Sequence, residues 1–84
     1  MNRQELQIVL SRAGVHPGLY SLDGPASQSE SYSLVRDGEA WKVLYKERGE
    51  FQQIQAGLSE SAACQLVYTL LDNAVGLSGR QHEA

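Results

Sequence analysis

The chain has 84 residues, with ten acidic side chains against seven basic ones and a formal net charge of −3 at pH 7. A chain of this length forms one domain with a modest core, and its hydrophobic content of 42% is that of an ordinary globule. The acidic balance excludes the basic stripe of a nucleic-acid binder, and no apolar run reaches the length of a membrane span. We expect a cytoplasmic protein, because the only cysteine is Cys64 and the first residues, MNRQELQ, lack the apolar core of a signal peptide.

The first predicted element is a helix over residues 3–13, because Asn2 is a suitable N-cap and Glu5 completes a capping box. A short strand over residues 19–22 follows. The polar loop that starts at Asp23 has too little apolar content to pack, since it is built from glycine, proline and small polar side chains.

Residues 30–51 predict a β-hairpin, because apolar and polar side chains alternate on both sides of a turn at residues 37–38. Matching the two apolar faces sets the register, which places Glu30 opposite Glu47. Two like charges directly across a strand pair repel, so water, a neighbouring arginine or a cation of a partner must compensate them. The same register pairs Tyr32 with Tyr45, Leu34 with Val43, and Arg36 with Trp41.

A further strand over residues 51–56 is expected to contain a bulge or to be short, because the spacing of Phe51 and Ile54 breaks strict alternation. A second helix over residues 60–75 is capped by Ser59. The order α-β-β-β-β-α predicts an α+β fold, a two-layer sandwich of an antiparallel four-stranded meander with two helices packed on one face. The aromatic face of the hairpin should meet the helices, and its opposite face should meet solvent or a partner. Residues 1–76 form the single domain, and residues 77–84 form a flexible C-terminal tail.

The candidate chemical groups are few. Nucleophilic catalysis needs a nucleophile, a base and an orienting group, whereas Cys64 falls inside the second helix, His16 precedes a proline and His82 lies in the tail. We therefore predict that the protein is not an enzyme and has no cofactor and no metal site. The Glu30–Glu47 pair has three interpretations: an acid–base pair, solvated strand ends, or a contact for a lysine or arginine of a partner.

Several short motifs lie between residues 19 and 64. The residues that carry them are Tyr20 to Leu22, Glu30 and Tyr32, Trp41, Val43 and Tyr45, Glu47 to Gly49, and Glu60, Ala63 and Cys64. Together they resemble small immunity proteins encoded beside bacterial polymorphic toxins, including those of contact-dependent growth inhibition systems. The resemblance implies a protein that binds a cognate toxin domain and blocks its active site directly, with no reaction of its own. A toxin with a basic active site, such as a nuclease, would suit this mildly acidic chain.

The predicted contact surface for the toxin consists of charged side chains, mainly unpaired carboxylates at one end of the sheet. These partner-binding residues are Asp23, Glu30, Glu47, Arg48 and Glu50, with Asp37 and Glu39 at the opposite hairpin tip as secondary candidates. The competing interpretation is a self-associating or adaptor module without a toxin, in which an edge strand over residues 19–22 or 51–56 pairs with another chain. We expect a monomer or a weak homodimer that binds neither nucleic acid nor membrane.

Overall fold

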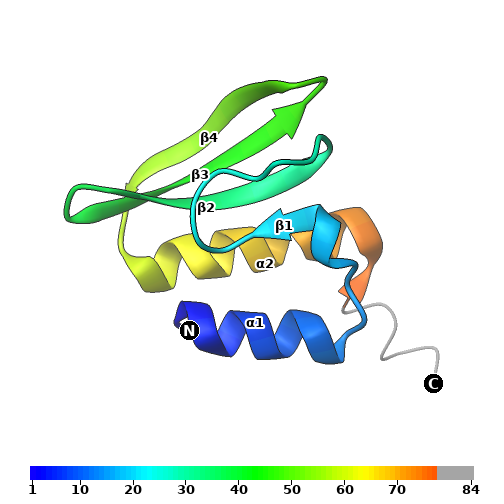
Figure 1. The fold of residues 1–84 in the computed structure, drawn as a ribbon. Coiled ribbons are helices and arrows are strands. Elements are labelled where there is room, and N and C mark those ends of the chain that lie inside the picture. Colours follow the sequence, from blue (N-terminus) through cyan, green and yellow to red (C-terminus); the bar gives the residue numbers. More distant parts are fainter. Residues whose placement is uncertain (78–84) are drawn as a thin grey trace.

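The computed structural model describes residues 1–77, which form two helices and a four-stranded sheet in the order α-β-β-β-β-α. Figure 1 shows both helices on one side of the sheet, so the predicted α+β class is confirmed. The helices are α1 (Arg3–Arg12) and α2 (Glu60–Val75), and a short 3-10 helix, η1 (Pro17–Leu19), precedes the sheet. The strands are β1 (Tyr20–Ser21), β2 (Ser31–Asp37), β3 (Ala40–Glu47) and β4 (Glu50–Leu58).

The sheet is mixed, which corrects the prediction of an all-antiparallel meander. Its strand order is β1-β2-β3-β4, and β1 runs parallel to β2, whereas the β2–β3 and β3–β4 pairs are antiparallel. A parallel pair needs a connection that returns the chain to its starting end. Residues 22–30 make this return, and a short connection suffices because β1 contains only two residues.

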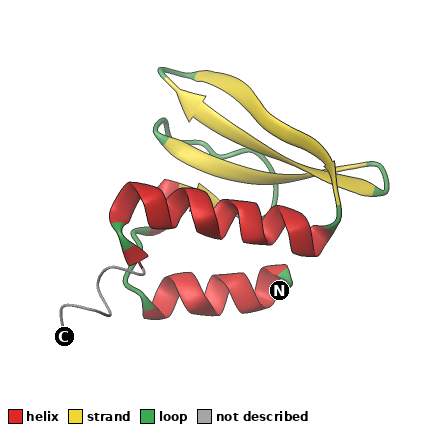
Figure 2. Cartoon of the chain, turned by 180° about the vertical axis from the view of Figure 1, so that it is seen from behind, coloured by secondary structure: helices red, strands yellow, loops and turns green. Residues whose placement is uncertain are grey.

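The β2–β3 register agrees with the sequence-based prediction, since Tyr32 lies opposite Tyr45, and the other two predicted pairs also form. The side chains of Leu34, Trp41 and Val43 are buried on the helix side of the sheet. They pack against the buried residues of the helices, which are Leu6 and Leu10 of α1 and Ala63, Cys64, Val67 and Leu71 of α2. Figure 2 shows the layers from behind, with α2 closer to the sheet than α1.

Both helices have the predicted caps. The Asn2 side chain accepts a hydrogen bond from the backbone N–H of Glu5, and the Glu5 carboxylate accepts one from the N–H of Asn2, each at 2.9 Å. Helix α2 starts at the Ser59 cap and ends at Gly76, which has a φ of 70°. Leu77, which we assigned to the tail, is 5% exposed and belongs to the core. The rest of that predicted tail, 78–84, lies outside the described residues.

Strand β4 is irregular and extends past Gly57, where the sequence predicted that it would end. Between Trp41 and Leu44, β3 advances by three residues while β4 advances by five, from Leu58 to Gln53. Two extra residues are thus accommodated as bulges, which confirms the predicted irregularity. Residues 50–57 are all exposed, and both ribbon views show the β3–β4 turn pointing away from the helices (Figures 1 and 2).

Candidate functional site

Three of the predicted contact carboxylates gather at the end of the sheet where β3 turns into β4. We call the group Glu30, Glu47, Arg48 and Glu50 the acidic rim. Glu47 lies directly opposite Glu50 in the β3–β4 ladder. Within residues 1–77, no ion pair engages any of the three carboxylates. The rim therefore presents two opposed like charges that the described part of the chain leaves uncompensated.

The predicted Glu30–Glu47 pair does not form. The β2–β3 ladder ends at the Ser31–Lys46 pair, and Glu30 leaves the strand with a φ of 60°. Its backbone N–H still donates to the carbonyl oxygen of Lys46 at 2.6 Å. This left-handed conformation aims its carboxylate at the Tyr45 hydroxyl, which donates to Glu30 Oε2 at 2.6 Å. Sequence reasoning placed these three glutamates at this end of the sheet but paired Glu47 with Glu30, whereas Glu47 lies opposite Glu50.

The surroundings of the Tyr45 hydroxyl raise its pKa. Its hydrogen bond to Glu30 raises the pKa of Tyr45 to about 12, with smaller contributions from partial burial and from the negative charges of Glu30 and Glu47. The ring of Tyr45 also packs beside that of Tyr32, with centroids 4.8 Å apart and planes tilted by 45°. The rim thus combines carboxylates with two partly buried aromatic rings.

The loop over residues 23–30 is packed on the sheet, contrary to the prediction that it could not pack. Ser31 and Ser33 lie on the face of the hairpin that was expected to meet solvent or a partner, and both are fully buried beneath this loop. The Ser33 hydroxyl accepts from the N–H of Ala26 at 2.9 Å, and the Ser31 hydroxyl donates to the carbonyl oxygen of Gln28 at 2.6 Å. Lys46 Nζ donates to the Ser27 carbonyl at 3.2 Å. Polar bonds to the backbone, which hydropathy does not register, hold this loop and so fix Glu30 in place.

The turn at the tip of the rim is a two-residue hairpin turn in which Arg48 has a φ of 53° and Gly49 a φ of 83°. Positive φ at both central residues is the pattern of a type I′ turn, which favours Asn-Gly and penalises most other residues at the first position. Gly49 N–H also donates to the Ser29 hydroxyl at 3.0 Å, tying the turn to the loop. Within the described chain, Glu30 and Arg48 are the only non-glycine residues with positive φ.

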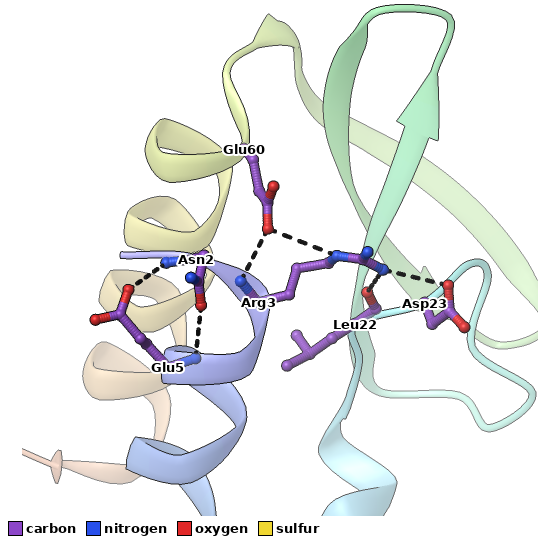
Figure 3. Close-up of polar contacts among 6 residues, drawn as sticks. All are labelled: Asn2, Arg3, Glu5, Leu22, Asp23 and Glu60. Carbon is purple, nitrogen blue, oxygen red and sulfur yellow. Dashed lines mark hydrogen bonds and ion pairs between the residues drawn. The ribbon is translucent and has the colours of Figure 1, made fainter.

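Asp23, also predicted at this end, lies elsewhere. Figure 3 shows it beside Arg3 of α1, and Arg3 Nη1 approaches Asp23 Oδ1 at 3.3 Å and the Leu22 carbonyl at 3.4 Å. Arg3 Nε also lies 3.7 Å from Glu60 Oε2, and its backbone N–H donates to the same oxygen at 3.0 Å. Of the secondary candidates, Asp37 is the last residue of β2 and Glu39 lies in the β2–β3 turn, at the far end of that hairpin from the rim.

Arg3 is the interacting residue that sequence reasoning missed. Its guanidinium lies 4.9 Å from the centre of the Trp41 ring, which Arg36 also approaches at 5.7 Å. A cleft of about 740 Å³ beside Arg3 is lined by α1 and by residues 22–23. Asp23 and Glu60 already engage the Arg3 guanidinium. This side chain therefore joins α1 to α2 and to the sheet. Nothing in the local pattern distinguishes Arg3 from an ordinary first-turn residue.

The remaining chemical groups offer little reactivity. Cys64 is fully buried, and burial raises the pKa of its thiol, which disfavours the reactive thiolate. Residues 1–77 contain no group of three or more His, Cys, Asp or Glu side chains placed to hold a metal ion. In the same range, no helix has the length and apolar character required to cross a bilayer.

Comparisons with known proteins add no relative. No protein-family model matches the chain, and neither the curated proteins nor the solved structures that were searched yield a significant match.

Proposed function

We propose that this protein is a cytoplasmic immunity protein that binds a cognate bacterial toxin domain and neutralises it by steric and electrostatic obstruction. The observation that carries the proposal is the acidic rim, where strained backbone and uncompensated charge coincide. The resemblance of residues 19–64 to immunity proteins of polymorphic toxins supplies the class of partner. The protein acts by binding alone and has no turnover of its own.

The rim carries two features that cost stability. Left-handed backbone at a non-glycine residue costs about 1–2 kcal/mol, and both Glu30 and Arg48 adopt it. Glu47 and Glu50 add repulsion across the β3–β4 ladder. Strain that the rest of the fold must offset is concentrated at functional sites, and here it accompanies the outermost charges of the sheet. An Asn-Gly turn in place of Arg48-Gly49, and an opposite-charge pair in place of Glu47 and Glu50, would be more stable. Selection for contact with a basic partner explains why the less stable residues are present.

The rim acts on the partner in two ways. Its three carboxylates attract a positively charged toxin surface and accelerate the encounter. Once docked, a lysine or arginine of the toxin fits between Glu47 and Glu50, and this cation removes the repulsion between them. The folded body behind the rim then keeps substrate away from the toxin's active site.

The deciding experiment is rescue of poisoned cells. The proposal predicts a large secreted protein with a variable C-terminal domain encoded immediately upstream of this gene, and the probe is that C-terminal domain, expressed from an inducible promoter. We expect growth when this protein is co-expressed with that domain and arrest without it. Continued arrest in the presence of the folded protein would refute the proposal.

Charge reversal identifies the surface. Replacing Glu47 and Glu50 together by lysine should weaken toxin binding in calorimetry by several kcal/mol, about the loss seen when close interfacial charge pairs are broken. The matched control reverses Asp37 and Glu39, which makes the same change of charge at the other end of the β2–β3 hairpin. If the control variant loses binding and the rim variant keeps it, the contact lies at the β2–β3 turn and the rim has no part in it.

A further inference from the structure

Within residues 1–77, no strand pairs with the outer edge of β4. The strand order places β4 at one edge of the sheet, and the loop over residues 23–30 donates and accepts hydrogen bonds with Ser31 and Ser33 of β2 and Lys46 of β3. Every residue from 50 to 57 is exposed, and Phe51 and Ile54 are each 43% exposed. A free edge presents unpaired N–H and C=O groups, which only another extended backbone satisfies in full.

The first half of β4 lacks the usual protection against such pairing. Proteins blunt edge strands with lysine, proline, bulges or a covering segment. Residues 51–56, FQQIQA, contain no charge and no proline. The bulges fall after Gln53, and the residues from Glu50 to Gln53 keep regular pairing with β3. A regular, uncharged stretch is therefore left exposed.

The ladder determines which backbone groups point outward. A two-residue turn closes on a hydrogen-bonded pair, which here is Glu47 with Glu50. Because hydrogen-bonded and non-hydrogen-bonded pairs alternate along an antiparallel ladder, Gln52 also bonds to β3, while Phe51 and Gln53 direct their N–H and C=O groups away from it. The accessible hydrogen-bonding sites of the edge are thus Phe51 and Gln53.

We propose that two copies of this chain pair antiparallel along β4, about a two-fold axis at Gln52, to form one continuous eight-stranded sheet. In this register, Phe51 of each copy forms the hydrogen-bonded pair with Gln53 of the other. The two Gln52 residues meet at the axis as a non-hydrogen-bonded pair. All four outward-directed residues find partners.

The same register explains the exposed phenylalanine. Phe51 lies on the outer face of the sheet, opposite Lys46, whose Nζ is 5.1 Å from the ring centre. Pairing about Gln52 makes the two Phe51 residues diagonal neighbours on this face, within reach of each other's rings. Glu50 of one copy faces Ile54 of the other, so no carboxylate lies opposite another. A second copy therefore matches the edge in hydrogen bonding, apolar contact and charge.

The association is expected to be weak, because a pairing of a few residues buries much less than the 1,200–2,000 Å² typical of stable interfaces. Sedimentation equilibrium from micromolar to millimolar concentration tests it directly. We expect the average mass to rise from the 9.2 kDa of the monomer toward twice that value. A constant monomer mass up to millimolar concentration would overturn the proposal.

Two variants localise the contact. Gln53→Pro removes an outward N–H without breaking a hydrogen bond to β3, and Phe51→Lys removes the apolar contact between the two copies. Each variant should remain a monomer at concentrations where the unmodified protein dimerises. The matched control is Ile8→Lys, the same kind of change at a residue of α1 that is 50% exposed. If the control abolishes the dimer, or if both edge variants retain it while folded by circular dichroism, β4 is not the interface.

Cross-linking tests the register itself. A non-hydrogen-bonded pair has Cα atoms about 4.5 Å apart, within the span of a disulfide, so Gln52→Cys should cross-link to a dimer under mild oxidation. Gln55→Cys places the two thiols six residues apart along the strands, about 20 Å, and should remain monomeric. The native Cys64 is buried and does not interfere. Equal cross-linking of both variants, or of neither, would refute pairing about Gln52. None of these measurements involves a toxin, so they stand or fall apart from the proposed function.

Discussion

Replacing Arg48 by asparagine should stabilise the protein, because the residue occupies the first central position of a type I′ turn. Arg48 has a φ of 53°, a conformation that costs an ordinary side chain about 1–2 kcal/mol. Asparagine is several-fold enriched in this region, so the Arg48→Asn variant should recover about 0.5–1 kcal/mol of that strain. For a domain of this size, 1 kcal/mol corresponds to roughly 4–8 °C in Tm. The exposed guanidinium makes no compensating ion pair within residues 1–77.

Urea denaturation followed by the fluorescence of Trp41, together with thermal melting, measures this change. The matched control is Glu39→Asn in the β2–β3 turn, because Glu39 is not among the positive-φ residues and should show no gain. Equal stability of Arg48→Asn and the unmodified protein, or an equal gain in the control, would refute the argument from backbone strain. If the rim binds a toxin, Arg48→Asn should also protect cells less well while being more stable.

Three further outcomes follow from the contacts. The pKa of Tyr45 is raised to about 12 from 10.0, so the folded protein holds the hydroxyl proton more tightly than the unfolded chain does. The contribution of this group to the free energy of unfolding should therefore be constant below pH 10 and fall as the pH rises toward 12. Tyr45→Phe should remove that part of the pH dependence in urea titrations. Arg3→Ala should lower the free energy of unfolding by about 1–2 kcal/mol, because it removes a contact with the Trp41 ring, a partly exposed ion pair with Glu60 and a weak, solvent-exposed one with Asp23. An unchanged Tm in thermal melting would contradict this role. The Cys64 thiol should react with a thiol reagent only as fast as the protein unfolds, so rapid labelling of the native protein would show that it is accessible.

Local patterns were sufficient for most of the fold. The capping box at Asn2 and Glu5 determines the start of α1, and Ser59 and Gly76 bound α2 as predicted. The β2–β3 register follows from matching two apolar faces, because a slip of one residue would expose Leu34 and Val43. These features depend on residues close in sequence or on one long apolar pattern, which a single sequence displays.

The errors arose where long-range polar contacts decide the structure. The direction of β1 depends on the path of residues 22–30, and bonds from Ser31 and Ser33 hold that loop against the sheet. Small polar residues in a strand predict a solvent-exposed face. Their burial here depends on the loop that covers them, and the strand's own pattern carries no sign of it. The same path gives Glu30 its left-handed backbone and separates it from Glu47. The rim could therefore be located from sequence but its internal pairing could not.

The two proposed surfaces share β4, and ionic strength separates them. Each copy carries a net charge of −3, and pairing about Gln52 brings the two Glu50 residues to positions about 14 Å apart along the strands. The screening length falls from about 30 Å at 0.01 M salt to about 8 Å at 0.15 M, so added salt weakens the repulsion between copies and should favour the dimer. Attraction between the acidic rim and a basic toxin decreases under the same screening. Sedimentation and toxin binding, each measured across this range, should thus change in opposite directions. Dissociation of the dimer on addition of salt would show that ion pairs hold the two copies together. The uncharged edge from Phe51 to Gln55 cannot supply ion pairs, so this result would contradict pairing along β4.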